Sequence, residues 1–367
     1  KSEANNVQDQ YYKDSPLLST NGYSNTAFGL VDGTTTGNES GTLGYVGRLN
    51  YSYDDKYLAE FLFRSDASTK FAPANYWGNF YSLSGGWVIS KESFFKSSVI
   101  DFLKVRASVG VLGKDDTKAW QWRQRFTYQD GKGGVFGNTA GSPASTGLKM
   151  EVTPNPDVTW SQELKTNYGI ETRLLNNRLS LSADYFFNKG TNILMNRTAN
   201  VPFTVGGSTA SENFGEVNFF GYELAAGWND KVGDFKYGLD VNFGWSDNKV
   251  ITGDFNAIDI KKPWIAKPGE SMDNGVWGYD CIGMFKDAAE VAAYVSGYNI
   301  RSVFGVLAAN LKPGSLYYRD VRGPLDTTTG TFAAPDGIVD EWDQVQLSKK
   351  KSTKYGMGTT LKFGYKQ

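Results

Sequence analysis

The sequence predicts an all-β protein, a segment of about nine strands from a transmembrane antiparallel β-barrel. Three observations support this fold class. Apolar and polar residues alternate over long stretches, short and long connections alternate along the chain, and aromatic residues stand at both ends of apolar strand faces. Length does not decide the matter, because 367 residues could hold several ordinary domains or one large all-β unit.

Period-two alternation places every second side chain on one face of a strand. From Phe235 to Trp245 every odd residue is apolar, whereas the even residues from Lys236 to Ser246 are polar or glycine. Such runs reach about ten residues, which is enough to cross a bilayer at a tilt, whereas soluble strands are usually about five or six residues long. The predicted strands are 45–53, 57–66, 80–89, 103–111, 163–174, 179–188, 218–228, 235–246 and 354–365.

The connections between these strands differ greatly in length. Short connections lie at 54–56, 176–177 and 229–234, and long ones at 112–160, 189–216 and 247–353. Outer-membrane barrels have short periplasmic turns and long extracellular loops, so we expect the long segments to be extracellular. Residues 1–44 are expected to lead into the barrel part, 45–367, as an extracellular loop or strand. The alternative, a soluble β-sandwich with an apolar core, explains neither the loop pattern nor the placement of the aromatics.

Composition excludes several function classes. With no histidine and a single cysteine, Cys281, the chain cannot form Cys/His zinc sites, Ser-His-Asp triads or Cys-His dyads. A net charge of -1 lacks the basic excess of a nucleic-acid binder. Mean hydropathy is low, at -0.42, as expected when the two faces of a barrel wall average out. The segment after Lys1 has no apolar signal core, so an export signal is expected upstream.

The polar strand faces carry charges of both signs, and we expect them to face the barrel lumen. These residues are Glu60, Arg64, Asp66, Lys104, Arg106, Glu171, Arg173 and Asp240. We interpret them as a neutralising lattice that is hydrogen-bonded to whatever fills the lumen. The alternative, an acid–base pair such as Glu60 with Asp66, rests on their proximity in sequence alone.

Aromatic residues in the long loops are candidate ligand contacts, because their rings can stack on sugar rings or on apolar ligand faces. The candidates are Trp120, Trp122, Tyr128, Trp264, Trp277, Tyr279 and Trp342. The alternative is that the loops pack on their own aromatic residues. No cofactor is predicted. Asp336 and Asp340, on either side of Gly337, are candidate ligands for a structural calcium ion, although Ala334 and Pro335 stand where an EF-hand would place further ligands.

Several motifs in order resemble the SusC/RagA family of TonB-linked outer-membrane transporters. The motifs are 45–57 (YVGRLNYSYDDKY), 64–71 (RSDASTKF) and 77–87 (WGNFYSLSGGW), supported by 102–110, 155–160, 176–180, 268–271 and 277–279. The likeness covers most of residues 41–365. The chain departs from the family at Asp320–Pro324, where an insertion precedes Asp336 and interrupts the usual Asp-rich turn.

The resemblance implies TonB-dependent import of oligosaccharides or peptides together with a SusD-like surface lipoprotein. It further implies a barrel of about 22 strands in the outer membrane of a Gram-negative, Bacteroidetes-like bacterium. The plug domain, through which such proteins contact the TonB complex, is not in this chain. Because the resemblance is to a family of transporters, the chain is not expected to be an enzyme. The alternatives are a passive porin or adhesin barrel and an outer-membrane hydrolase, and a plug in the full gene product would distinguish import from a passive pore.

Overall fold

The computed structural model describes residues 2–8, 36–119, 121–124, 126–129, 132–134, 147–150, 152–197 and 208–366. The chain forms two compact units. We call them the wall unit, drawn from residues 1–246, 251–254 and 357–367, and the loop unit, drawn from residues 247–250 and 255–356.

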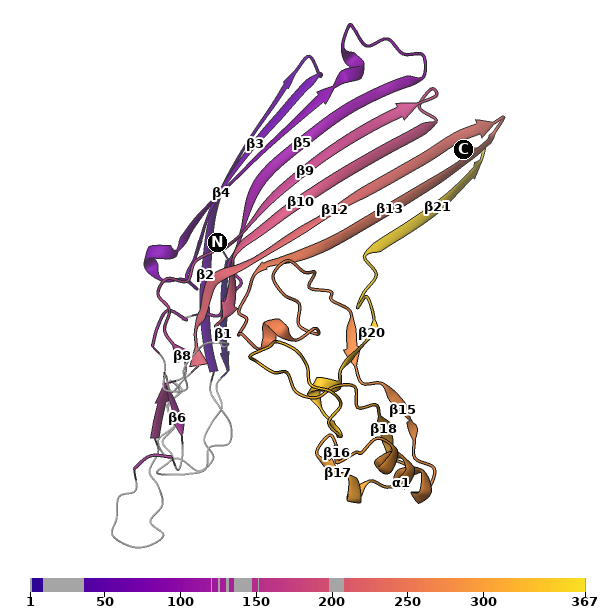
Figure 1. The fold of residues 1–367 in the computed structure, drawn as a ribbon. Coiled ribbons are helices and arrows are strands. Elements are labelled where there is room, and N and C mark those ends of the chain that lie inside the picture. Colours follow the sequence, from indigo (N-terminus) through magenta and orange to yellow (C-terminus); the bar gives the residue numbers. More distant parts are fainter. Residues whose placement is uncertain are drawn as a thin grey trace. The chain divides into compact units, whose positions relative to one another are not determined.

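The wall unit is built on one continuous sheet, which contains ten strands among the described residues (Figure 1). In sheet order these are β1 (Ser2–Gln8), β2 (Thr36–Tyr53), β3 (Tyr57–Ser68), β4 (Trp77–Val88), β5 (Ile100–Lys114), β9 (Ser161–Leu174), β10 (Leu179–Asn196), β12 (Ser211–Val232), β13 (Phe235–Thr252) and β21 (Tyr355–Tyr365). The pairings from β1 to β12 are antiparallel. All nine predicted strands are confirmed, and β1 is an additional one.

Several strands continue beyond the predicted ranges on the side of the long loops. Strand β10 extends to Asn196 rather than residue 188, and β12 begins at Ser211 rather than residue 218. Strand β2 begins at Thr36. Apolar–polar alternation is required only where one face meets hydrocarbon, so the sequence pattern marks the membrane-crossing part of a strand and not its extension into water.

Two of the short connections, at 54–56 and 176–177, are tight turns in left-handed backbone conformation, whereas the predicted connection 229–234 shortens to Gly233 and Asp234 because β12 runs to Val232. Asp54 and Asp55 have φ values of 52° and 50°, and Asn176 and Asn177 both have φ of 59°. Hairpin turns with two consecutive positive φ values match the twist of the strands, and Asn and Asp tolerate this conformation better than other residues with side chains. The sequence therefore fixes these turns through residue types that suit the backbone.

The apolar face of the sheet is exposed along the strands from β2 to β21. Leu49, Phe61, Leu83 and Val109 pair in register across four strands. Their exposed fractions are 68%, 43%, 55% and 42%. A soluble sandwich would bury these side chains, whereas a barrel wall turns them toward lipid.

Aromatic rings pair near both ends of this apolar face. At the short-turn end the pairs are Tyr57–Trp87 and Phe235–Phe363, with ring centroids 6.5 and 6.1 Å apart, and further along they are Tyr45–Trp77 and Tyr222–Trp245, at 5.9 and 5.5 Å. Aromatic rings favour the two membrane interfaces, so these pairs fit two girdles around a hydrocarbon band.

The wall unit also contains a small core beside the long loops. Phe71, Phe80, Val158 and Trp160 are all at least nine-tenths buried and pack together. A β-carbon on Gly113 would overlap the Phe80 ring, so that glycine makes room for the core. The short elements of this unit are η1 (Pro73–Asn75), η2 (Ile89–Lys91), β6 (Phe126–Gln129), β7 (Gly147–Met150), β8 (Val152–Thr153) and β11 (Ser208–Thr209).

The loop unit has a hydrophobic core of its own, formed by Phe285, Tyr294, Ile300, Val303 and Val339, none more than 5% exposed. The predicted loop 247–353 is therefore largely a folded body. Its elements are η4 (Asp259–Lys261), β14 (Val276–Gly278), β15 (Cys281–Met284), α1 (Ala288–Gly297), β16 (Ser302–Val303), β17 (Val306–Leu307), η5 (Ala308–Asn310), β18 (Leu316–Tyr318), β19 (Ile338–Val339), η6 (Glu341–Asp343) and β20 (Val345–Ser348).

Helix α1 begins at an aspartate cap, because the Asp287 carboxylate accepts a hydrogen bond from the backbone N–H of Glu290 at 2.9 Å. The helix is only ten residues long. Among the described residues, no helix combines the length and apolar character needed to span a bilayer.

Polar contacts join the segment that enters the loop unit, near residue 247, to the segment that leaves it, near residue 354. The Asp247 carboxylate lies 2.7 Å from the Lys354 ammonium and accepts a hydrogen bond from the Ser271 hydroxyl at 2.8 Å. Asp273 accepts hydrogen bonds from the backbone N–H groups of Lys351 and Ser352 at 2.6 and 3.1 Å. These contacts join the departing and returning segments.

The orientation of β13 is tested by a charge on its apolar face. Leu239→Arg is expected to lower the free energy of unfolding by about 2–4 kcal/mol if Leu239 lies near the bilayer midplane, because the charge would enter hydrocarbon. Denaturant titration in liposomes, together with heat-modifiable migration, measures the loss. Asn242→Arg on the opposite face of β13 is the matched control. Equal effects of the two variants would contradict the orientation.

Candidate functional site

The polar face of the sheet carries the charged residues predicted to face the lumen, and most of them lie in ion pairs. Glu60 pairs with Arg48 on the neighbouring strand, and Arg64 pairs with Asp66 on its own strand. The Glu60 and Asp66 carboxylates therefore each have an arginine partner and do not form an acid–base pair with one another.

The best-connected group on this face centres on Arg106 of β5. Its Nε lies 3.0 Å from Glu171 Oε1, and its Nη2 donates to Asp184 Oδ2 at 2.8 Å. Lys104 Nζ lies 3.8 Å from the same Glu171 oxygen. The group has two positive and two negative charges, so this part of the wall is electrically balanced.

The contact between Arg106 and Asp184 depends on Gly169. Residue 169 of β9 pairs with Arg106 on one side and with Asp184 on the other, so the two side chains must reach across the middle strand. A β-carbon at Gly169 would lie 2.6 Å from Asp184 Oδ1 and 2.8 Å from Arg106 Nε. The absent side chain therefore allows an ion pair between strands that are not direct neighbours.

A second glycine makes room for a charged side chain at the other end of the sheet, although the ion pair there joins neighbouring strands. Asp240 of β13 pairs with Lys362 of β21. A β-carbon at Gly227 on β12 would lie 2.8 Å from Asp240 Oδ1 and 2.7 Å from the Ser180 hydroxyl oxygen. Glycines on the polar face thus leave room for long charged side chains to lie along the wall.

Arg173 lies on the same face but makes a different contact, since its guanidinium carbon lies 4.8 Å from the centre of the Phe102 ring. The sequence interpretation did not include Asp184, Arg48, Lys362 or Gly169 among the site residues. Alternation places all four on the polar face. Their partners follow only from the strand register, which the sequence pattern leaves open.

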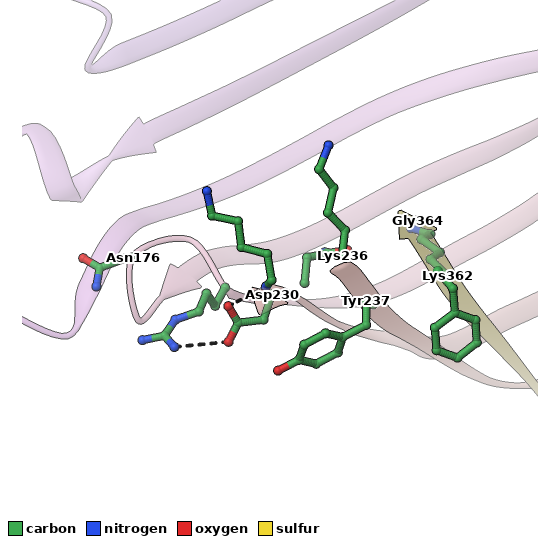
Figure 2. A pocket seen from close by; sticks show the side chains of 11 residues that line it. Asn176, Asp230, Lys236, Tyr237, Lys362 and Gly364 are labelled. Carbon is green, nitrogen blue, oxygen red and sulfur yellow. Dashed lines mark hydrogen bonds and ion pairs between the residues drawn. The ribbon is translucent and has the colours of Figure 1, made fainter. Parts of the chain in front are cut away.

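A hollow of about 650 Å³ lies at the short-turn end of the wall and is shown in Figure 2. Arg178 Nη1 lies 3.2 Å from Asp230 there. Figure 2 shows the Tyr237 and Lys236 side chains projecting to opposite sides of β13, so alternation persists to the rim. Because the hollow collects groups from both faces of the sheet, it does not form a single ligand site.

Three of the predicted loop aromatics meet in the loop unit. Trp264 lies at the centre, with ring centroids 6.4 Å from Trp277, 6.1 Å from Trp342 and 6.4 Å from Phe332. All four side chains are half-buried, and we call them the Trp264 cluster. The rings pack on one another and also keep part of their surface open.

Charged groups border the Trp264 cluster. Lys262 Nζ lies 5.2 Å from the centre of the Trp342 ring, 3.1 Å from Asp259 and 3.9 Å from Glu341. Donors and acceptors therefore stand side by side at the edge of the aromatic surface.

The other candidate aromatics lie elsewhere. Tyr279 packs edge-on against Phe304 at 4.6 Å and against Tyr318 at 6.2 Å, apart from the Trp264 cluster. Trp122 belongs to the wall unit, where the Arg123 guanidinium carbon lies 4.4 Å from its ring centre. Trp120 and the side chain of Tyr128 lie outside the described residues.

Asp336 and Asp340 hold local backbone. Asp336 accepts a hydrogen bond from Ile338 N–H at 2.9 Å, and Asp340 caps η6 by accepting from Trp342 N–H at 2.9 Å. Within the described ranges, no group of three or more acidic or cysteine side chains is placed to hold a metal ion.

Comparison with known proteins gives one consistent group of relatives. The chain is 29% identical over 242 residues to a TonB-dependent receptor of Formosa agariphila, covering 65% of this chain and 22% of the relative. It is 27% identical over 331 residues to the TonB-dependent receptor SusC of Bacteroides thetaiotaomicron, covering 88% of this chain and 30% of SusC. The chain therefore spans less than a third of the curated relatives named here. No family model matches it.

Solved structures show the same fold. The RagAB peptide transporter superposes with a TM-score of 0.63 at 18% identity, covering 96% of this chain and 35% of the transporter chain. Its closed-closed state superposes with a TM-score of 0.64. The resemblance to the SusC/RagA family and the barrel-segment fold are both confirmed. The named relatives are receptors and a transporter, in agreement with the prediction that the chain is not an enzyme.

The role of Gly169 can be tested by adding one carbon atom. Gly169→Ala is expected to lower the free energy of unfolding by about 1–3 kcal/mol, because the new methyl group must push Arg106 and Asp184 apart. A double-mutant cycle between Arg106→Ala and Asp184→Ala, measured in both backgrounds, should show their coupling lost. Gly244→Ala is the control, because its β-carbon would meet only one atom, 4.0 Å away. Equal losses in the two glycine variants would refute this role.

Proposed function

We propose that this chain forms part of the barrel wall and an extracellular loop unit of a TonB-dependent importer of the SusC/RagA type. The cargo is an oligosaccharide or a peptide, and a SusD-like surface lipoprotein works with the importer. The observation that carries the proposal is the two-faced sheet, apolar on one side and charge-balanced on the other, in a chain whose relatives are TonB-dependent receptors.

The division of labour follows from the two faces. Alternate apolar residues hold the wall in lipid, whereas lumen and loop residues meet the cargo. The ion pairs around Arg106 neutralise one another, which leaves a polar surface with no strong preference for cargo of one charge. A plug domain and its contact with TonB would lie in the parts of the relatives that this chain does not cover.

The location we propose is the outer membrane of a Gram-negative bacterium of the Bacteroidetes type. SusC is a protein of Bacteroides thetaiotaomicron, and another relative is from Formosa agariphila. The exposed apolar face and its aromatic girdles fit a bilayer environment.

Within the loop unit, we assign cargo contact to the Trp264 cluster. Its half-open ring surfaces offer π-faces to sugar rings or apolar peptide side chains. Beside them, the Lys262 ammonium and the Asp259 and Glu341 carboxylates supply donors and acceptors together, which suits hydroxyl and amide groups.

The import proposal is tested with the full-length gene product in its own host. Growth on a panel of oligosaccharides and peptides as sole nutrient should identify a cargo whose uptake is lost when either this gene or TonB is deleted. Restoring the intact gene is the control. Uptake that persists without TonB would instead support a passive pore, and turnover of cargo by the purified protein would support a hydrolase.

The Trp264 cluster is tested by removing single rings. Trp342→Ala is expected to weaken cargo binding about threefold to tenfold, because one stacking face is lost, worth about 0.5–1.5 kcal/mol. Calorimetry on the purified full-length transporter measures the dissociation constant. Phe304→Ala is the matched control, since Phe304 belongs to the separate Tyr279 group of the same unit. Affinity that is unchanged in Trp342→Ala would rule out cargo contact there.

A further inference from the structure

The apolar face of the wall unit contains a hollow of about 860 Å³ toward the short-turn end of the sheet. Gly85 of β4 pairs with Ala107 of β5, and the same row continues with Tyr168 of β9 and Tyr185 of β10. The two small residues leave space between the strands' larger side chains, and the tyrosine rings, 57% and 48% exposed, border that space. The hollow is therefore a depression in the surface that meets hydrocarbon.

The hollow opens on the apolar face even though Arg106 and Asp184 also line it. Their side chains point to the opposite face, where they form an ion pair at 2.7 Å, so only their main chain can reach the hollow. A β-carbon on Gly85 would have the Leu58 carbonyl oxygen, at 3.9 Å, as its one neighbour within 4 Å. The space in front of Gly85 is thus open and apolar.

Two aromatic residues that border the hollow also hold the connection from β4 to β5. The Tyr57 hydroxyl donates to Glu92 Oε1 at 2.6 Å, and Trp87 Nε1 donates to the same oxygen at 2.9 Å. Phe94 of this connection packs edge-on against Trp87, with ring centroids 6.4 Å apart, and is 68% exposed. Aromatic rings at a strand end lie at the level of lipid headgroups, so the hollow reaches that level.

Exposed charges of both signs stand at this rim. Lys91 Nζ lies 3.3 Å from Asp55 Oδ2, and these side chains are 47% and 81% exposed. Lys56 is engaged with Asp54 at 2.9 Å. Lys96, in the same connection, is exposed and has no ion-pair partner among the residues that the structure describes. Ammonium groups beside an open carboxylate are complementary to a headgroup that carries both a phosphate and an ammonium.

We propose that the hollow and its rim bind one phospholipid of the periplasmic leaflet. One acyl chain fills the space in front of Gly85 and Ala107. At the rim, Lys91 and Lys96 contact the phosphate, and Asp55 accepts hydrogen bonds from a primary ammonium of the ethanolamine type. The assignment of the leaflet rests on the proposed outer-membrane location, whereas the lipid itself is a partner beyond the import function.

The chemistry of the rim selects among lipids. A carboxylate accepts hydrogen bonds from a primary ammonium, whereas a choline headgroup has no N–H donor and a glycerol headgroup has no positive charge. The hollow lies at the short-turn end, so a lipid of the leaflet beside the long loops would have its headgroup at the wrong end of the strands. An ethanolamine phospholipid therefore fits both parts of the site.

Native mass spectrometry of the delipidated full-length transporter in detergent tests the hollow. The first phosphatidylethanolamine should bind more tightly than later ones, and Gly85→Leu should weaken it about tenfold, the effect of expelling about two methylene groups. Ala107→Leu fills the same space from the neighbouring strand and should act alike. Gly47→Leu is the matched control, because Gly47 lies on the apolar face of β2 outside the hollow, with no atom within 4 Å of its β-carbon position.

Headgroup variants test the rim in the same measurement. Wild-type protein should prefer the ethanolamine lipid over choline and glycerol lipids with the same acyl chains. Asp55→Asn keeps the left-handed turn and should abolish this preference. Lys91→Gln should weaken binding of all three lipids about threefold. Lys231→Gln, at the turn between β12 and β13, is the control and should have no effect.

Several results would overturn the proposal. They are equal binding of the first and later lipids, equal losses in Gly85→Leu and Gly47→Leu, and displacement of the lipid by inorganic phosphate. A dimer mass that Gly85→Leu abolishes would instead assign the hollow to a second copy of the chain. Heat-modifiable migration verifies that each variant is folded. Lipid binding is measured without uptake, so its failure is distinguishable from failure of the import proposal.

Discussion

The structure depends above all on one constraint, which is that backbone N–H and C=O groups cannot remain unpaired where there is no water. A sheet satisfies these groups between strands, and the ten described strands do so in one continuous ladder. Because strand side chains alternate, the same ladder must present one face to lipid and the other to the lumen. The exposed Leu49, Phe61 and Leu83 on one face and the ion pairs on the other are consequences of this geometry.

A second consequence concerns the polar face. Charged side chains are long, and a wall lined with them would be crowded unless other positions were small. Gly169 supplies that space between Arg106 and Asp184, which meet across an intervening strand, and Gly227 supplies it beside Asp240. The glycines on the polar face therefore allow the charged side chains to lie close enough to neutralise one another.

The nine membrane strands could be predicted from the sequence, because alternation is a local consequence of lipid on one side. Their water-exposed ends could not, since neither face of those ends has to be apolar, as at β10 beyond residue 188. The fold of the loop unit could not be predicted from the sequence either. Phe285 and Val339 pack together although 53 positions separate them, and Trp264 meets Trp342 only because the chain folds back. Asp336 and Asp340, the candidate calcium ligands, accept hydrogen bonds from the backbone N–H groups of Ile338 and Trp342, contacts that depend on the local turn and not on residue type alone.

The central claim is that the two faces of the sheet meet different solvents, and labelling of single cysteines along β13 tests it most directly. With Cys281 replaced by serine, cysteines are placed one at a time from residue 235 to residue 246 in the full-length protein in lipid. A membrane-impermeant thiol reagent should react at even positions, and lipid-borne quenchers should reach probes at odd positions only. Reactivity without a period of two, or with the faces exchanged, would contradict the account.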